Sequence, residues 1–314
     1  MKRFPLVLIS AAILTGAAVT PAAASPVADL NGGKQDATVD VVDFNVLAPI
    51  WAAPEWYPAD MDMSLLDTEY RRARITDYLE ASSATAEVVC LQEVQQSELP
   101  YLRQAIGSEF SGGMAHNDRD FWSNWVVPEL GWAPNGTAVF VRTSVLSDPT
   151  FTDLPTGDGN HIALISATHE ATGQQVRVAS VHLDSDSNTN RLNEIRALRD
   201  AWPKKRGTTD IVCGDINEDT IIGSASGVFD RMGFVDVLAS VGNREWTHPW
   251  HDSYNMSKRW GIIDHILVRN GTPLDGDVID SGVWSIDEET ARIEANFRRI
   301  GSDHFPVEGS LRVP

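Results

Sequence analysis

Cysteine is scarce in this sequence, which has two such residues, Cys90 and Cys213, among 314. A small scaffold stapled by many disulfides is therefore excluded, and a chain of this length buries a full core without staples. Each cysteine lies in an apolar run that is typical of a buried strand. Because a cysteine in a core strand usually acts as a small apolar side chain, we expect two free buried thiols, with a disulfide as the alternative in an oxidising compartment.

Basic residues are also few, with 25 lysines and arginines against 44 acidic residues and a formal net charge of −19. This excess of acid argues against tight, sequence-independent binding of nucleic acid through a broad basic patch. It does not exclude a nuclease, because divalent cations can screen both the site and the substrate.

Long apolar runs are absent after the first two dozen residues. Lys2 and Arg3 precede an apolar run at 6–19, and the alanines at 22–24 match the small residues that signal peptidase accepts. We expect residues 1–24 to be a signal peptide, which makes the protein secreted; a retained anchor is the alternative, although the run is short for a membrane span. We expect the mature chain to be a monomer without a transmembrane segment, with 23 basic and 44 acidic residues and a net charge of −21.

Residues 25–37 are predicted to be a flexible lead-in, and residues 38–314 one α/β domain, since the chain has no repeat, low-complexity tract or linker. Mixed strands and helices, some strands alternating and some uniformly apolar, predict two packed β-sheets with helices outside. The predicted strands are 39–46, 88–91, 138–142, 163–168, 176–183, 210–213, 262–268 and 305–311. The predicted helices are 67–81, 98–106, 191–202 and a short one near 228–232.

Polar and acidic side chains recur where these apolar strands end or begin. They are Asn45, Glu93, His182, Asp215, Asn217, Asp264, Asp303 and His304. Each alone has an ordinary explanation: Asn45 as a turn residue, Glu93 as a helix-start acid, Asp264 as a partnered strand carboxylate. Strand ends at one edge of a sheet hold fixed side chains that can converge on a ligand, so the whole set predicts a site.

These residues lie in motifs that resemble, in chain order, those of the endonuclease/exonuclease/phosphatase superfamily. The motifs are Asn45-Val46-Leu47, Leu91-Gln92-Glu93-Val94, Val181-His182-Leu183, Gly214-Asp215-Ile216-Asn217, Ile263-Asp264-His265 and Ser302-Asp303-His304-Phe305-Pro306-Val307. The resemblance runs from about Val39 to Leu311. Three finer features resemble the deadenylase-like branch: Phe44-Asn45-Val46-Leu47-Ala48-Pro49, Glu69-Tyr70-Arg71-Arg72 and Gly136-Thr137-Ala138-Val139-Phe140. Some DNA-repair relatives carry an acid where this chain has Leu47, so an apurinic-site nuclease is not expected.

The resemblance implies a four-layer α/β sandwich, two packed mixed β-sheets flanked by helices, and a metal-dependent phosphoester hydrolase. An oxygen-only ligand set suits Mg²⁺ or Mn²⁺. The metal ligand is expected to be Glu93, with Asn45 completing the shell and Asp303 as a second contributor.

The remaining motif residues are expected to act on the substrate by in-line attack of water on phosphorus, without a covalent intermediate. Asp215 would orient or deprotonate the water, and Asn217 would hold the water or a phosphoryl oxygen. His304, kept cationic by Asp264 as in relatives, would contact the phosphate, and His182 would donate to the phosphorane.

Substrate contacts are less well specified. Asn160 is a candidate at the border of the substrate. Trp125 and Trp250 lie in two aromatic loops that would stack on bases, lie at a lipid interface or simply cap the rim of the sandwich.

Other polar residues have ordinary structural explanations. We expect His248 and His251 to lie on a surface loop rather than to bind a metal, because a third ligand is missing. His265 is expected to be packed or hydrogen-bonded. Arg191 and Glu194 are expected to form a surface pair.

The sequence thus predicts a secreted phosphoester hydrolase, foremost a nuclease or phosphodiesterase acting on nucleic acid. The alternative keeps the chemistry and changes the substrate to a phospholipid, an inositol phosphate or a sugar phosphate. A non-catalytic binding module is the second alternative, although such domains typically lose site residues that are all present here.

Overall fold

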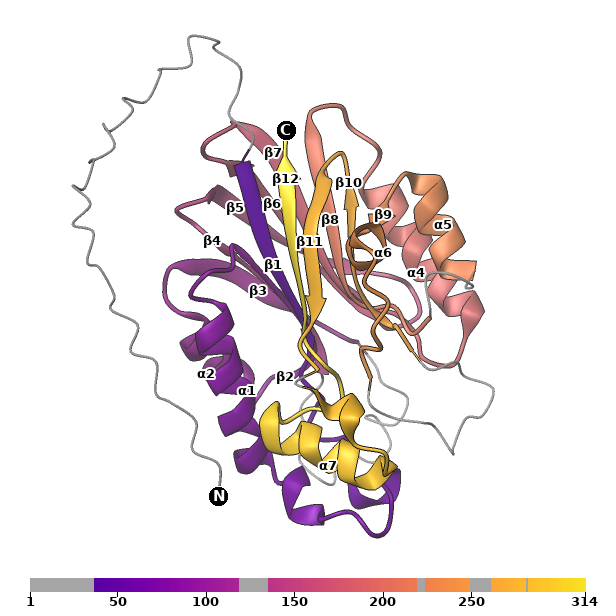
Figure 1. Cartoon of the computed structure of the whole chain (residues 1–314). Helices are drawn as coiled ribbons and strands as arrows, with labels where there is room; N and C mark the ends of the chain where they lie inside the picture. The colour runs from indigo at the N-terminus through magenta and orange to yellow at the C-terminus, as the bar shows by residue number, and fades with distance from the viewer. Residues whose placement is uncertain (1–36, 119–134, 219–223, 249–260, 281) are drawn as a thin grey trace, which may run out of the picture. The chain divides into compact units, whose positions relative to one another are not determined.

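Two six-stranded β-sheets pack face to face in the computed structural model (Figure 1). It describes residues 37–118, 135–218, 224–248, 261–280 and 282–314. The predicted signal peptide, most of the lead-in, Trp125, Trp250 and His251 lie outside the described residues. No helix within the described ranges is long and apolar enough to cross a membrane.

The first sheet joins strands from both ends of the described chain in the order β11-β12-β1-β2-β4-β3. Its strands are β1 (Ala37–Asn45), β2 (Val88–Gln95), β3 (Phe110–His116), β4 (Asn135–Arg142), β11 (Thr272–Val278) and β12 (Val307–Val313). The second sheet has the order β5-β6-β7-β8-β10-β9. Its strands are β5 (Leu146–Pro155), β6 (His161–His169), β7 (Gln174–His182), β8 (Thr208–Asp215), β9 (Val235–Asp236) and β10 (Asp264–Arg269).

Helices cover the outer faces of both sheets, which completes the four layers (Figure 1). Ile75 and Leu79 of α1 (Thr68–Ser82) and Leu102 and Ile106 of α2 (Leu99–Ile106) pack on the first sheet. The second sheet is covered by α4 (Asn188–Ala201) and α5 (Ser224–Met232). Further helical segments are α6 (Val237–Val241), α7 (Glu289–Arg299), η1 (Pro54–Trp56), η2 (Met63–Leu66) and η3 (Val283–Ser285). The predicted fold class is confirmed.

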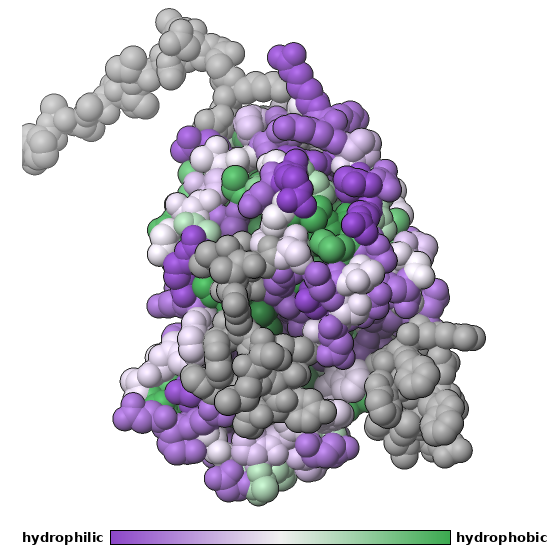
Figure 2. Space-filling view, turned by 90° about the vertical axis from the view of Figure 1, so that its right-hand side faces the viewer, coloured by the Kyte–Doolittle hydropathy of each residue, from purple (hydrophilic) through white to green (hydrophobic). Residues whose placement is uncertain are grey.

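Hydrophilic side chains cover most of the face that carries α4 and α5, and the exposed apolar ones gather mainly in its upper half (Figure 2). This distribution suits the strongly acidic composition of the chain.

Two parallel strand pairs determine where the polar strand ends meet. β1 runs parallel to β2, with Asn45 opposite Gln92, and β7 runs parallel to β8, with His182 opposite Asp215. β10 is antiparallel to β8 and begins at the same edge, with Asp264 opposite Asp215. Because the carboxyl ends of parallel neighbours share an edge, these side chains gather at one end of the sandwich.

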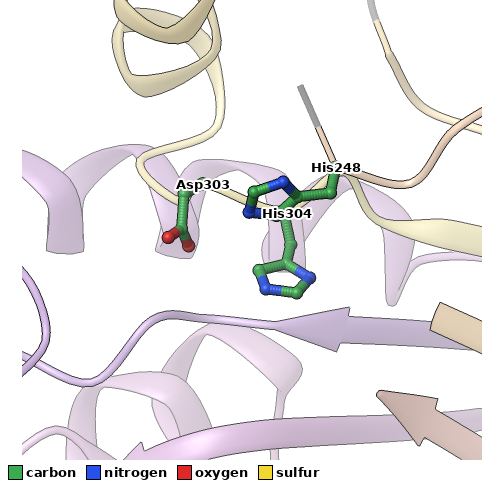
Figure 3. A group of neighbouring side chains, drawn as sticks. All are labelled: His248, Asp303 and His304. Carbon is green, nitrogen blue, oxygen red and sulfur yellow. The ribbon is translucent and has the colours of Figure 1, made fainter. Parts of the chain in front are cut away.

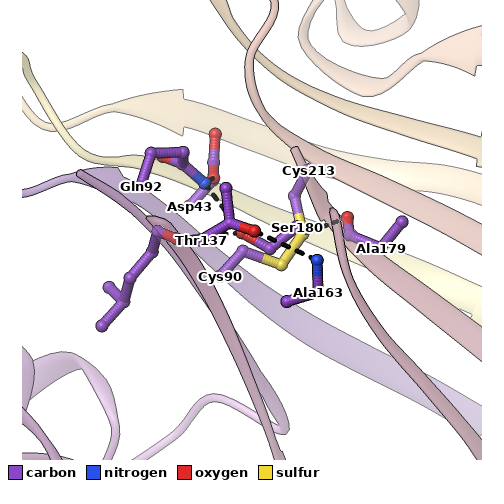
Figure 4. Close-up of a disulfide and its surroundings, with 9 residues drawn as sticks. Asp43, Cys90, Gln92, Thr137, Ala163, Ala179, Ser180 and Cys213 are labelled. Atoms are coloured by element: carbon purple, nitrogen blue, oxygen red, sulfur yellow. Dashed lines mark hydrogen bonds between the residues drawn. A yellow bond between two sulfur atoms is a disulfide. The ribbon is translucent and has the colours of Figure 1, made fainter. Parts of the chain in front are cut away.

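The two cysteines form a disulfide, so the expectation of free thiols is wrong (Figure 4). Cys90 of β2 and Cys213 of β8 are both fully buried in the core between the sheets, with their Cα atoms 6.2 Å apart. The sequence identified each strand but not which positions face each other across the sandwich. The disulfide therefore links the strand that carries Glu93 to the strand that carries Asp215.

Candidate active site

Asn45 connects carboxylates from both sheets. Its Nδ2 atom donates to Glu93 Oε1 at 3.0 Å and to Asp215 Oδ2 at 3.2 Å, while its Oδ1 accepts from the Leu47 amide. All three polar side chains are buried. A carboxamide N–H₂ between two carboxylates offsets part of their mutual repulsion, which otherwise makes two buried acids costly.

Glu93 reaches this position through a local distortion of β2. The register of β2 against β4 shifts between Leu91 and Val94, and Glu93 has a left-handed backbone with φ 56°. The second carboxylate oxygen accepts from the Ala48 amide at 3.0 Å. Bulges and left-handed non-glycine residues are costly and concentrate at functional sites, where they redirect a side chain.

The Gly214–Asn217 turn is shaped by close contact with β7. Gly214 has φ 149°, and a Cβ atom added there would lie 1.9 Å from the carbonyl oxygen of Val181, so only glycine fits. The Asn217 amide donates to Asp215 Oδ1 at 2.8 Å, and its Nδ2 donates to the Leu183 carbonyl at 2.8 Å. Asn217 thus fixes both the carboxylate of Asp215 and the chain that follows His182.

Two histidines approach the same carboxylate oxygen. The Nε2 atoms of His182 and His304 lie 3.6 Å and 3.8 Å from Asp215 Oδ2. On its other side, His304 Nδ1 contacts Asp264 Oδ2 at 2.9 Å. The arrangement is therefore a chain of acid, imidazole and acid that runs from Asp264 to Asp215.

Burial and charge set the protonation of this chain. Burial, together with the nearby Asp264 carboxylate, raises the pKa of Asp215 to about 6. Burial alone would lower the pKa of His304, but the Asp264 carboxylate raises it well above its ordinary value. In turn His304 lowers the pKa of Asp264 although burial opposes this. The site thus holds a cationic imidazole beside an acid that changes charge near neutral pH, as a general base requires.

Thr247 and His248 join the site although the sequence did not predict them there; Figure 3 shows His248 beside His304 and Asp303. The Thr247 hydroxyl accepts from the amides of Ile263 and Asp264, both at 3.1 Å. The His248 ring packs edge-to-face on His304 with centroids 4.8 Å apart. We expected His248 on a surface loop; it is half-buried against the site because Thr247 ties this segment to β10.

Tyr57 was also missed, because it lies in a proline- and aromatic-rich loop without periodicity. Its hydroxyl donates to Asp303 Oδ2 at 3.2 Å. Burial and the Asp303 charge raise the pKa of Tyr57 well above its ordinary value, which keeps it a donor. The other Asp303 oxygen is buried and has no hydrogen-bond partner among the described residues.

Arg71 of α1 supports the site from behind. Its buried guanidinium donates to the carbonyl oxygens of Val46 and Gly301, both at 2.8 Å, and to that of Leu47. One side chain therefore fixes the chain on each side of the cluster, after Asn45 and before Asp303. Its place in the Glu-Tyr-Arg-Arg motif was the only sequence signal for it.

The expected surface pair of Arg191 and Glu194 is wrong. Glu194 is fully buried and accepts from Asn160 Nδ2 at 2.5 Å and from the Asp184 amide at 2.9 Å. Arg191 instead lies 3.6 Å from Glu218. Helical spacing predicted two neighbours on an exposed face, but the loops at Asn160 and Asp184 fold over that face.

Asn160 lies just before β6, and its carboxamide nitrogen donates to Glu194. His265 is fully buried, as expected, with Nδ1 2.9 Å from Asp236 and Nε2 2.9 Å from the Ile262 carbonyl oxygen. His265 therefore faces away from Asp264 and supports the fold.

The donor atoms fit a hard divalent cation. The Glu93 carboxylate and the unpaired Asp303 oxygen are the oxygen donors that such ions prefer. Within the described part of the chain, two groups offer donor atoms within 4.8 Å of one another: Asp215, Asp264 and His304, and His248, Asp303 and His304. Asn45 directs its nitrogen rather than its oxygen at the carboxylates, so it orients Glu93 in this arrangement.

The fold defines a four-layer α/β sandwich with acids at its strand ends, and the comparisons with known proteins give the family. The model of the endonuclease/exonuclease/phosphatase family matches residues 44–304, and the chain belongs to this family. Its members are phosphoester hydrolases. No curated protein sequence matches the chain.

Several solved structures share the fold at low sequence identity. The endonuclease/exonuclease/phosphatase from Bacteroides vulgatus is 17% identical with a TM-score of 0.61, over 88% of this chain and 100% of that one. ANGEL2, a 2′,3′-cyclic phosphatase in complex with adenosine-2′,3′-vanadate, is 14% identical with a TM-score of 0.65, over 88% and 96%. D. rerio TDP2 in complex with a single-strand DNA product is 17% identical with a TM-score of 0.56, over 88% and 99%.

Proposed function

We propose that this protein is an exported phosphodiesterase that depends on Mg²⁺ or Mn²⁺ and cleaves nucleic acid. The observation that carries the proposal is the convergence of Glu93, Asp215, His182 and the His304–Asp264 pair at one end of the sandwich. An acid whose pKa is raised to about 6 by burial, and which lies between two imidazoles, is typical of a functional site.

Each side chain has a task that its contacts support. Glu93, with Asp303, would hold the cation, which when bound neutralises the phosphoryl oxygens of the substrate. Asp215 accepts the proton of the attacking water, and Asn217 fixes the carboxylate through its amide. His304, kept cationic by Asp264, binds a phosphoryl oxygen, and His182 donates to the oxygen that gains charge in the transition state.

Nucleic acid is the substrate class that the comparisons favour. ANGEL2 was solved with an adenosine vanadate and TDP2 with single-strand DNA. The deadenylase-like motifs of the sequence support the same choice. The excess of acidic residues favours cation-assisted binding in a local site over a broad basic groove.

Two independent features support export. The first residues have the form of a secretory leader. The buried disulfide between Cys90 and Cys213 forms and persists in an oxidising compartment.

The decisive experiment measures release of nucleotides from single-strand DNA and RNA with Mg²⁺ and with EDTA. Glu93→Gln and Asp215→Asn should each reduce the rate by about 100-fold or more, because they remove a cation ligand and a general base. Glu170→Gln, at an exposed acid outside the site, is the matched control and should leave the rate unchanged.

The same panel tests the alternative substrates. It should include a phospholipid, an inositol phosphate and a sugar phosphate. Mg²⁺-dependent hydrolysis of one of these, with none of DNA or RNA, would keep the chemistry and refute nucleic acid as substrate. No hydrolysis of any phosphoester, together with no Mg²⁺ binding by calorimetry, would indicate a binding module.

A further inference from the structure

The loop at residues 48–63, which we call the rim loop, is attached to the candidate site at two points. The Ala48 amide donates to Glu93 Oε2 at 3.0 Å. Nine residues later the Tyr57 hydroxyl donates to Asp303 Oδ2 at 3.2 Å. Both acceptors are proposed cation ligands, so the rim loop begins at the candidate site and returns to it at Tyr57.

Two tryptophans lie between the two attachment points. The Trp51 ring is half-buried against the apolar clusters below the loop, and Trp56 packs edge-to-face on it with ring centroids 6.3 Å apart. Trp56 leaves 43% of its surface exposed, whereas its neighbour Tyr57 is buried and directed at Asp303. Since the Tyr57 hydroxyl contacts Asp303, the Trp56 Cα atom lies at most one Cα–Cα step plus a tyrosine side chain from that contact, or roughly 10–14 Å.

The rim loop is rigid enough to present a flat ring in a fixed place. Its own backbone bonds include Trp51 N to Ala48 O at 2.9 Å and Trp56 N to Ala53 O at 3.0 Å. Tyr57 packs edge-to-face on Phe297 of α7 with centroids 5.4 Å apart. An aromatic ring that is already ordered loses little conformational entropy when a ligand covers it.

The charges on the rim loop indicate what would cover that ring. Glu55, Asp60 and Asp62 are exposed on the same loop. Their charge disfavours an anionic lipid surface but not the uncharged π-face of a nucleobase. Base–aromatic stacking tolerates any sequence and suits a protein without a basic groove.

We propose that Trp56, backed by Trp51, is a stacking platform for a nucleobase that lies next to the scissile phosphodiester. The inference rests on the proposed function, since it names the part of a nucleic acid that the site recognises besides the phosphate. Trp56 binds substrate and takes no part in the proton transfers, so its loss weakens recognition of bases and leaves the chemistry intact.

The kinetic test compares two single-strand oligonucleotides, one with all its bases and one in which abasic residues flank the cleaved bonds. Trp56→Ala should lower kcat/KM about 10- to 100-fold on the intact strand, mainly through KM, and change little on the abasic strand. Trp56→Phe should retain most of the rate. Tyr101→Ala is the matched control, because Tyr101 is an aromatic residue 45% exposed on α2.

Equal losses on both strands, or no loss on either, would overturn the inference. A binding assay tests the inference apart from catalysis. The Asp215→Asn protein is expected to turn over at least about 100-fold more slowly, and fluorescence anisotropy reports its affinity for labelled intact and abasic strands. The Asp215→Asn protein should prefer the intact strand, and adding Trp56→Ala should abolish that preference.

Failure of the proposed function has a different signature. Wild-type protein that cuts no nucleic acid refutes the function, while the anisotropy assay still decides whether Trp56 binds bases. Loss of binding to phosphatidylcholine vesicles in Trp56→Ala, with oligonucleotide binding unchanged, would assign the platform to lipid and overturn the inference.

Discussion

Glu194 makes the stability of the protein depend on pH in a way that one substitution can isolate. Its carboxyl group is fully buried, and burial raises its pKa from 4.5 to about 7, although the bond from Asn160 opposes the shift. A raised pKa in the folded state means that folding favours the protonated form. Stability is therefore retained at low pH and lost as the pH rises from about 4.5 to about 7.

The size of the effect follows from the shift. Each pKa unit corresponds to about 1.4 kcal/mol, so a shift of this size predicts a loss of roughly 2–3 kcal/mol between pH 5 and pH 8. Glu194→Gln has no charge to bury and should lack this loss. The substitution also places an amide donor opposite the Asn160 side chain or the Asp184 amide. The destabilisation from two facing donors is the same at every pH.

Urea denaturation of wild type and Glu194→Gln at pH 5, 6, 7 and 8 measures the difference directly. Between pH 5 and pH 8, we expect the free energy of unfolding of the variant, relative to that of the wild type, to rise by about 2–3 kcal/mol. Parallel stability curves would refute the reasoning, because they would mean that the Glu194 carboxyl titrates alike in the folded and unfolded chains.

Three further predictions concern the frame of the site. Gly214→Ala should destabilise the fold by about 3 kcal/mol and abolish activity, since its Cβ meets the Val181 carbonyl; wild-type thermal stability would contradict this. Replacing Cys90 and Cys213 together by alanine should cost about 4 kcal/mol, because the disulfide closes a loop of 123 residues; denaturation midpoints equal to those of oxidised wild type would show that it contributes nothing. Arg71→Met should cost about 3–5 kcal/mol and reduce activity, because three buried carbonyl groups lose their donor, and denaturation with a parallel rate assay separates the two effects.

The sequence predicted the gathering of the site because strand ends are easy to locate. An apolar run that stops at a polar residue marks an edge, and parallel neighbours bring such edges together. Asn45, His182 and Asp215 meet for this reason. Glu93 meets them for another reason, since it lies within β2 and is redirected by a bulge that no sequence pattern announced.

Contacts between elements that are distant in the sequence were harder to predict. Nothing in the runs around Cys90 and Cys213 shows that the two side chains face each other. Glu194 looked exposed because a helix pattern reveals which residues share a face and not which loop covers that face. Tyr57 and Thr247 lie in irregular segments, where periodicity carries no information.

Whole elements were missed for a similar reason. β5 and β11 are rich in exposed polar residues, so neither has the apolar run that identifies a core strand. α7 is a helix that buries only one side, and no apolar run marks it. β3, with two adjacent glycines, likewise lacks such a run. Edge strands pair through their backbones, and their side chains need little apolar character.

The last described strand has a consequence for the order in which the candidate site is assembled during synthesis. β12 lies between β1 and β11, so the first and last described strands are partners, and Asp303 and His304 immediately precede it. A nascent chain that already contains Glu93 and Asp215 lacks the imidazole of His304 and leaves one side of β1 without its neighbour. Under the proposed function, a product that stops before His304 is therefore expected to be inactive, because it lacks the cationic imidazole beside Asp215.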